Sequence, residues 1–357
     1  MADPRIVAYA KVLTDHSIDI KKGDLIEINA NIEARPLVLE LCKNILKKGA
    51  TPRLNVGMPG FNYTYYKHAP DSVLRQYPKI AEYSTKNTAG IISIFSPDNT
   101  RELNNVDANK VSQRMKIVKP ISELRLKQNN WVLCAFPTSA LAQEADMSLE
   151  EFEDFVYSAV NVDYNKMKKE QLKIKALYDR SNEIHVVGPE TDLYVNIEGR
   201  QGILCCGNRN VPDGEVFIGP VETKTEGHIS YSFPAIYQGR SVEGVKLLFK
   251  KGKAIKATAE KNEAFLNKIL DTDKGARYLG EFSFGLNYGI KQHIKEILFD
   301  EKIGGTIHLA LGMAYKEGGG KNDSAVHWDM IKDMRRDGKV FFDGKLVYKN
   351  GKFIRFN

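Results

Sequence analysis

The first 145 residues alternate between short apolar runs and longer amphipathic segments. Apolar residues recur at helical spacing in residues 34–48 and 110–126, and Asp71 is expected to cap a short helix that extends to Tyr77. Four runs predict strands, at residues 24–30, 52–57, 89–95 and 131–136, and the last two are apolar enough to be buried strands. Strands that alternate with helices indicate an α/β domain whose mainly parallel sheet carries helices on both faces.

The pattern changes twice further along the chain. Residues 148–180 are helical in spacing, and Ser148 with Glu151 has the capping-box form SxxE. After residue 183, short runs separated by turns predict strands at 184–187, 193–197, 229–236, 245–249 and 254–258, with one helix at 260–270. The pairs Asp343-Gly344 and Asn350-Gly351 predict hairpin turns. We therefore expect an α/β domain at 1–145, a helical junction at 146–182 and an α+β catalytic domain rich in antiparallel strands at 183–357.

Composition narrows the class of protein. A chain of 357 residues exceeds what one hydrophobic core usually supports, and 42% hydrophobic with 27% charged residues is typical of a globular protein. We expect no membrane span, and the absence of an apolar run near the N-terminus predicts a cytoplasmic protein. The net charge of +7 is spread over amphipathic segments without interleaved aromatics, which argues against a nucleic-acid partner. The four cysteines lack zinc or disulfide spacing and are interpreted as core thiols.

Candidate chemistry is concentrated in the C-terminal half. Glu215 lies between a turn and an apolar run, and Glu281 lies between aromatic residues and glycines. His327 and Asp329 are two residues apart, so a strand would present both on one face. Taken singly, Glu215 and Glu281 are more simply explained as partly exposed turn residues that pair with lysines.

Taken together with His308, these residues form a set of three carboxylates and two imidazoles. Such a mixture suits zinc, cobalt or manganese. Two divalent cations, three carboxylates and one hydroxide would be electrically neutral, and bridging carboxylates hold two metals about 3.5–4 Å apart in hydrolytic sites. The small residues Ala310 and Gly312 would let ligands approach, and Tyr315 adds a phenol. The sequence thus predicts a dinuclear metal site.

The sequence motifs of several other enzyme classes are absent. No histidine is followed by glutamate as in HExxH, and residues 239–243 lack the second glycine of a nucleophile elbow. The run Gly318-Gly319-Gly320-Lys321-Asn322 lacks the first glycine and the final hydroxyl residue of a phosphate-binding loop, so we interpret it as a flexible lid or turn.

Four motifs in order resemble the thermophilic-type metallo-aminopeptidases of family M29, the aminopeptidase T and aminopeptidase S group. The motifs are NVPDGEVF, LGEFSFGLN, GGTIHLALGMAY and SAVHWDM. The resemblance implies a two-domain plan and a homodimer. It also implies that Glu281 and Asp329 bridge two metals and that Tyr315 lies near them. The metal ligands implied by it are Glu215, Glu281, His308, His327 and Asp329.

We therefore expect an aminopeptidase that hydrolyses N-terminal residues from peptides with a free N-terminus, with Glu281 and Tyr315 as catalytic residues. Two alternatives remain open. The same ligand mixture could serve a dimetal phosphoesterase, or the chain could be a basic protein without enzymatic activity that binds nucleic acid or scaffolds a partner.

Overall fold

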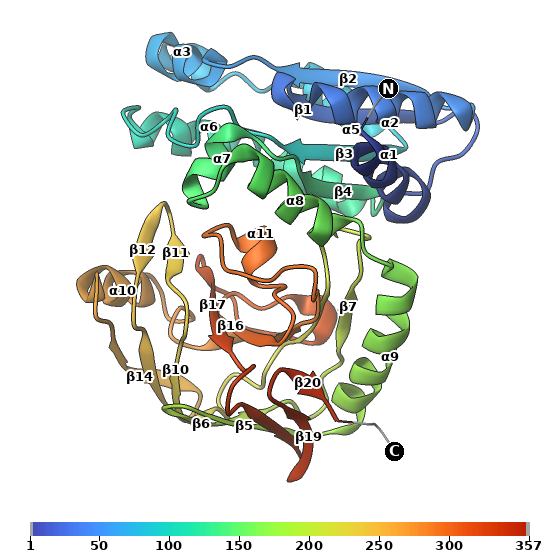
Figure 1. Ribbon diagram of the computed structural model, residues 1–357. Helices are drawn as coiled ribbons and strands as arrows, with labels where there is room; N and C mark the ends of the chain where they lie inside the picture. Colours follow the sequence, from blue (N-terminus) through green and yellow to red (C-terminus); the bar gives the residue numbers. More distant parts are fainter. Residues whose placement is uncertain (1–2, 355–357) are drawn as a thin grey trace. The chain divides into compact units, whose positions relative to one another are not determined.

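The computed structural model describes residues 3–354, in which the chain forms two compact units (Figure 1). Unit 1 contains Met1–Asn161 and Gly207–Pro212, and unit 2 contains Val162–Cys206 and Asp213–Asn357. The division falls between α8 (Leu149–Val160) and α9 (Tyr164–Arg180), inside the 146–182 segment. Among the helices of residues 3–354, none is both long and apolar enough to cross a membrane.

Unit 1 is built on a parallel sheet in the order β2-β1-β3-β4-β8. Its strands are β1 (Leu25–Asn31), β2 (Thr51–Gly57), β3 (Gly90–Phe95), β4 (Trp131–Ala135) and β8 (Asn210–Val211). Its helices are α1 (Pro4–Lys11), η1 (Val12–Ser17), η2 (Ile32–Ala34), α2 (Arg35–Lys47), α3 (Phe61–His68), α4 (Asp71–Leu74), α5 (Lys79–Asn87), α6 (Ala108–Lys127), α7 (Ser139–Glu144) and α8.

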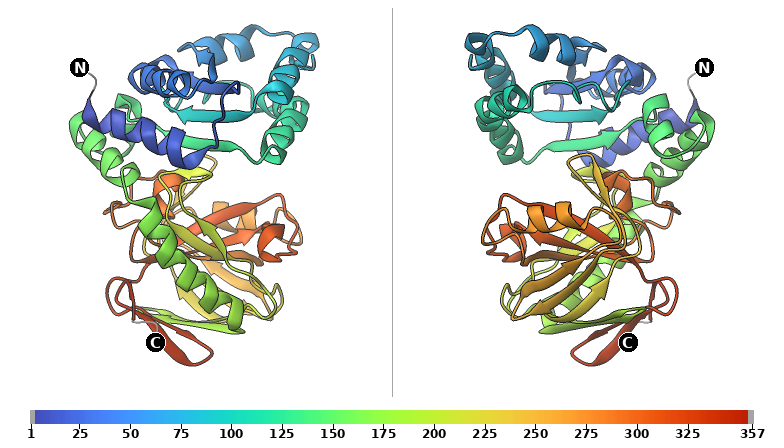
Figure 2. Two further views of the ribbon diagram at one scale, coloured as in Figure 1. Left: turned by 90° about the vertical axis from the view of Figure 1, so that its right-hand side faces the viewer. Right: turned by 90° about the vertical axis from the view of Figure 1, so that its left-hand side faces the viewer.

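The strand order explains why helices lie on both faces of this sheet. The connection from β1 to β2 moves in one direction along the sheet, whereas β2 to β3 and β3 to β4 move in the other. Because such crossovers are right-handed, α2 must cover one face and α5 and α6 the opposite face. Figure 2 shows this arrangement. The predicted α/β class of the N-terminal part is confirmed.

Local predictions in unit 1 differ from the structure around residue 71. Asp71 is the first residue of α4 rather than its cap, which is Pro70, and the helix ends at Leu74 instead of Tyr77. The following Pro78 disfavours a helical conformation at Tyr77, which shortens the element. The sequence pattern also missed α3 and α5, whose apolar residues are few and largely exposed.

Unit 2 contains two large antiparallel sheets and a two-stranded one. The eight-stranded sheet has the order β14-β13-β10-β6-β5-β18-β19-β20, and the five-stranded sheet has the order β17-β16-β15-β9-β7. Its strands are β5 (Glu183–Gly188), β6 (Thr191–Asn196), β7 (Ile203–Cys205), β9 (Glu215–Ile218), β10 (Glu226–Ser230), β11 (Ala235–Tyr237), β12 (Arg240–Val242), β13 (Lys246–Lys250), β14 (Lys253–Thr258), β15 (Leu279–Gly285), β16 (Thr306–Gly312), β17 (His327–Asp333), β18 (Lys339–Phe342), β19 (Lys345–Lys349) and β20 (Lys352–Phe353). Its helices are α9, α10 (Glu263–Leu270), α11 (Ile297–Asp300) and η3 (Lys316–Gly318).

The core of unit 2 lies between the two large sheets. Leu193 of the eight-stranded sheet and Phe282 and Phe284 of the five-stranded sheet belong to one buried cluster. Tyr178 of α9 closes this cluster, with its ring centroid 6.1 Å from that of Phe284. Burial of these rings between the sheets supplies the main driving force for their packing.

Local sequence signals agree with the structure at the two hairpin turns and at one helix cap, but not at residues 229–236. Both residues of each predicted hairpin pair, Asp343-Gly344 and Asn350-Gly351, have positive φ, as primed turns require. Ser148 and Glu151 form the predicted capping box of α8 in unit 1. The strand predicted at 229–236 is instead divided into β10 and β11, because Pro234 has no N–H to continue the ladder.

Candidate metal centre

The five-stranded sheet has two chemically different faces. Along β15, Phe282 and Phe284 enter the hydrophobic core, so Glu281 and Ser283 point to the other face. The same alternation applies to β9, β16 and β17, which are neighbours in this sheet. The residues predicted from the sequence as metal ligands all lie on this second face: Glu215, Glu281, His308, His327 and Asp329.

Strand register leaves space between these side chains. Ala310 of β16 pairs with Glu281 on one side and with Asp329 on the other. Gly312 pairs with His327. Because a methyl group and a hydrogen occupy these central positions, the longer acidic and imidazole side chains can converge above β16.

The polar ends of the five side chains are close together. Nε2 of His308 lies 3.1 Å from Oε2 of Glu215 and 3.1 Å from Oε1 of Glu281. Nε2 of His327 lies 3.5 Å from Oδ2 of Asp329 and 3.9 Å from Oε2 of Glu281. Nδ1 of His327 lies 2.8 Å from the carbonyl oxygen of Met313, which suits a donor there and leaves Nε2 free to bind a ligand. Glu281 thus faces both histidines, one with each carboxylate oxygen.

These atoms fit divalent cations. The ligand atoms of Glu215, Glu281 and His308 lie within 4.8 Å of one another, as do those of Glu281, His327 and Asp329. Ligands of a tetrahedral zinc ion at 2.0–2.1 Å stand roughly 3.3 Å apart, close to the 3.1 Å separations around His308. Oδ1 of Asp329 is buried and has no hydrogen-bond partner among residues 3–354. A cation would satisfy it.

Burial and neighbouring charged groups shift the pKa values of the residues in the centre, mostly in opposite directions. Burial opposes ionisation of Glu215, but Lys302, His308 and Ser283 lower its pKa to about 2. Burial raises the pKa of Glu281, and His308 opposes that rise. Burial would lower the pKa of His308, yet the two flanking carboxylates raise it well above 6.5. In the metal-free protein the two flanking carboxylates therefore favour the protonated form of His308.

Two residues of the centre were missed by the sequence analysis. Glu301 forms a third group with His308 and Asp329, with ligand atoms within 4.8 Å, and Lys302 contacts the carboxylate of Glu301. Nζ of Lys302 lies 3.9 Å from Oε1 of Glu215. Both residues follow α11 in the run Asp-Glu-Lys, whose three charges are typical of a surface turn. No periodic pattern distinguishes this turn from an exposed one, so only the fold reveals it.

Burial also changes the chemistry of this pair. It raises the pKa of Glu301 to about 8, and Lys302 opposes that rise. Burial would lower the pKa of Lys302, but Glu301, Glu215 and Asp213 raise it, so the ammonium group stays charged.

Tyr315 lies beside the centre, as expected. Its ring centroid is 5.2 Å from that of His327 and 5.5 Å from that of Phe217. Burial and the carboxylates of Glu281 and Asp329 raise the pKa of its hydroxyl. The phenol therefore stays protonated and can donate a hydrogen bond.

The glycine-rich run at 318–322, predicted as a flexible lid or a turn, forms a turn that is anchored by hydrogen bonds. Nδ2 of Asn322 donates to the carbonyl oxygens of Gly275 and Gly312, and the amide of Lys321 donates to Glu222 at 2.7 Å. A Cβ on Gly320 would lie 2.5 Å from Cβ of Ala314, so this position requires glycine. The close packing keeps the turn next to the strand that leads to Tyr315.

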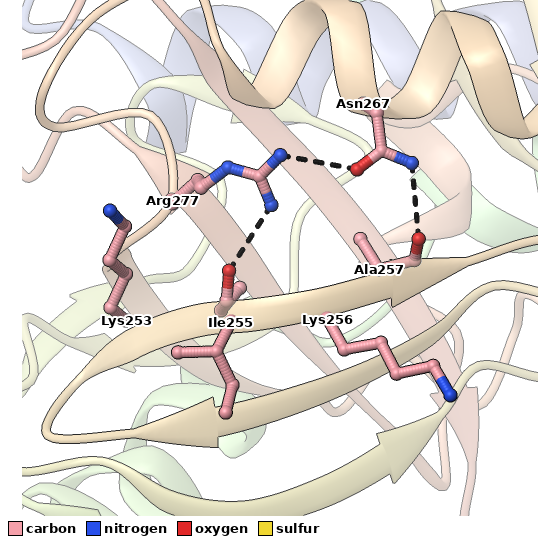
Figure 3. Close-up of a pocket in the computed structure, with 7 residues that line it drawn as sticks. Lys253, Ile255, Lys256, Ala257, Asn267 and Arg277 are labelled. Carbon is pink, nitrogen blue, oxygen red and sulfur yellow. Dashed lines mark hydrogen bonds between the residues drawn. The ribbon is translucent and has the colours of Figure 1, made fainter.

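Two hollows lie away from the centre. One, of about 420 Å³, lies over β14 and α10 and contains Lys253, Lys256 and Arg277 (Figure 3). The guanidinium of Arg277 is occupied by Asn267, Asp271 and the carbonyl oxygen of Ala254. The other, of about 480 Å³, lies in unit 1 at the carboxyl ends of the parallel strands. Neither is lined by any of the predicted ligands, so the chemistry is best sought at the centre on the five-stranded sheet.

The fold combines an α/β unit with an antiparallel unit that carries the candidate metal ligands. The chain belongs to the thermophilic metalloprotease family M29, whose sequence model matches residues 2–353. The resemblance inferred from the four motifs is confirmed.

Relatives and solved structures agree with this assignment. The chain is 28% identical to Aminopeptidase 2 of Geobacillus stearothermophilus, over 96% of each protein. It is 26% identical to Aminopeptidase AmpS of Bacillus subtilis, over 97% of this chain and 98% of that protein. The structure of AmpT from Thermus thermophilus matches with a TM-score of 0.86 at 24% identity, over 98% of this chain and 99% of that one. That likeness establishes the shared fold.

Proposed function

We propose that this protein is an aminopeptidase that removes N-terminal residues from peptides at a centre of two divalent metal ions. The observation that carries the proposal is the overlap of two donor groups at Glu281, each with one histidine and one further carboxylate. All of the relatives named above are called aminopeptidases. A homodimer and a cytoplasmic location stay predictions.

We assign the five candidate ligands to two ions according to the two donor groups in which they lie. Glu215 and His308 would hold one ion, His327 and Asp329 the other, and Glu281 both. Bound zinc, cobalt or manganese would activate water and polarise the scissile carbonyl. Glu301 lies beside Asp329 and His308 without being needed for either group. We assign it as the carboxylate that accepts the proton of the attacking water and returns it to the leaving amine nitrogen.

The substrate test uses Leu-p-nitroanilide and other aminoacyl anilides, with N-acetyl-Leu-p-nitroanilide as the blocked control. Metal-stripped protein should be inactive, and zinc, cobalt or manganese should restore release of the chromophore from the free-amine substrates only. Equal cleavage of the acetylated anilide would contradict an exopeptidase. Turnover of phosphate esters without release from any anilide would instead establish the phosphoesterase alternative.

Metal stabilisation should grow with pH. The raised pKa values of Glu301 and His308 mean that the folded metal-free protein retains protons that the unfolded chain has released. The retained protons stabilise the folded metal-free protein fully below the unfolded-state pKa values, about 4.5 for Glu301 and 6.5 for His308. This stabilisation is lost as the pH rises toward the pKa values of the two groups in the folded protein. Metals compete with the same protons. We expect a larger metal-induced rise in Tm at pH 8 than at pH 6.

Differential scanning fluorimetry of stripped and zinc-loaded protein at the two pH values measures this difference. Glu215, whose pKa is lowered to about 2, is ionised throughout this range and adds no slope. An increase in Tm that is the same at pH 6 and pH 8 would show that protons and metal do not compete at this centre.

Replacement of Tyr315 with phenylalanine should lower kcat by up to about a hundredfold and leave KM nearly unchanged. Loss of one hydrogen-bond donor to a transition-state oxyanion has effects of this order. Steady-state kinetics with Leu-p-nitroanilide and measurement of bound metal test the assignment together. If the variant loses metal in proportion to activity, Tyr315 is a ligand instead of a donor.

A further inference from the structure

Lys302 is the most unusual charged residue of unit 2. Its side chain is 0% exposed, although lysine is almost never fully buried without a partner. Its backbone is fixed on both sides, because its amide donates to the carbonyl oxygen of Phe299 and its own carbonyl oxygen accepts from the amide of Asn287. The backbone that carries this buried side chain is therefore anchored on both sides.

The surroundings of Nζ are acidic. It contacts the carboxylate of Glu301 and lies 3.9 Å from that of Glu215. Asp213, which is also 0% exposed, has its carboxylate within 4.8 Å of that of Glu215. Lys302 thus lies near two buried carboxylates, those of Glu215 and Asp213, and the partly buried carboxylate of Glu301, of which Glu301 and Asp213 lie outside the five ligands proposed for the metals.

Lys302 contributes to the charge balance of the centre. The centre and its immediate neighbours contain five acids, of which three are buried and two are partly buried: Asp213, Glu215, Glu281, Glu301 and Asp329. When all five acids are ionised and the metal-bound solvent is neutral water, two divalent cations neutralise four of these charges and leave one negative charge in a water-poor interior, where an unpaired charge is costly. The ammonium of Lys302 neutralises the fifth.

We propose that Lys302 is a resident cation of this centre, whose fixed charge, together with two divalent ions, balances the five acids and thereby sets the metal affinity. This inference rests on the dinuclear centre of the proposed function. A fixed positive charge beside the ligands has two consequences. It stabilises the acids when no metal is bound, and it repels incoming divalent ions, so it limits their affinity.

The test compares Lys302→Met, which keeps the length of the side chain without its charge, with Lys302→Arg, which keeps the charge. Zinc affinity is measured by competition with a chromophoric chelator, and the Tm of the stripped proteins by calorimetry. Lys302→Met should bind zinc at least tenfold more tightly than the wild type and have a lower metal-free Tm. Lys302→Arg should bind zinc within about threefold of the wild type.

A double variant guards against a simple folding defect. Asp213→Asn in the Lys302→Met background removes one negative charge together with the positive one, so neutrality returns. It should bring zinc affinity back toward the wild-type value and raise the metal-free Tm above that of Lys302→Met. A role in packing alone predicts no such rescue, because the amide does not refill the space of the ammonium group.

The outcomes separate the two proposals. Wild-type protein that fails to bind two equivalents of zinc overturns the dinuclear centre and this inference with it. Wild-type protein that binds two equivalents, with unchanged or weaker zinc affinity in Lys302→Met, leaves the proposed function intact and overturns the role of Lys302 alone. Tighter zinc binding that Asp213→Asn reverses supports it.

Discussion

Glu281→Gln should lower kcat/KM for Leu-p-nitroanilide by roughly 10⁴-fold, the scale of losing one member of a catalytic unit. Glu281 is the residue shared by both donor groups, and its two oxygens face His308 and His327. Glutamine has nearly the same shape but only one oxygen and no charge. The variant therefore removes the link between the two ion positions without opening a cavity in the sheet.

Two further measurements are needed to interpret this loss of activity. Bound zinc per protein chain should fall below two equivalents in Glu281→Gln, while the fold, judged by far-ultraviolet circular dichroism, stays intact. Glu226→Gln is the matched control, because Glu226 is an exposed glutamate of β10 in the eight-stranded sheet that accepts a hydrogen bond from the amide of Lys251. Glu226→Gln should retain full activity. Full activity in Glu281→Gln would rule out the proposed centre.

Glu301→Gln should lower kcat by about 10²–10⁴-fold while two equivalents of zinc remain bound, because general acid–base catalysis has this magnitude. Glu301 adjoins the donor groups but is not required to complete either one. Its loss should therefore affect the proton transfer more than the metals or KM. Lys302 would then lack its closest carboxylate, so the variant should also be less stable than the wild type without metal.

Glu301→Asp provides the comparison for this position. Aspartate keeps the carboxylate but withdraws it by one methylene, so kcat should lie between those of the wild type and Glu301→Gln. Pre-steady-state and steady-state kinetics with Leu-p-nitroanilide, together with metal analysis, distinguish the roles. Loss of one zinc equivalent in Glu301→Gln would make Glu301 a metal ligand and exclude it as the proton acceptor.

Much of the candidate centre was predictable because it lies on regular strands. In β15 and β17 the side chains alternate between the two faces, so the apolar residues Phe282, Phe284 and Trp328 fix the opposite orientation for Glu281, His327 and Asp329. The hairpin turns at Asp343-Gly344 and Asn350-Gly351 were predictable for a similar local reason, since few residue pairs accept two consecutive positive φ angles.

The sequence by itself therefore indicated the class of each unit, the shared face of His327 and Asp329, and the five candidate ligands. Tertiary structure alone decided which polar residues outside the strands join them. Glu301 and Lys302 lie in a charged turn without periodicity, and their burial depends on contacts with Asn287 and Glu215, which are distant in the chain. The anchoring of the turn at 318–322 was not predictable for the same reason, because its hydrogen bonds come from Glu222 and from the Asn322 side chain to Gly275 and Gly312. Local pattern sets a side chain's direction, whereas non-local packing sets its environment.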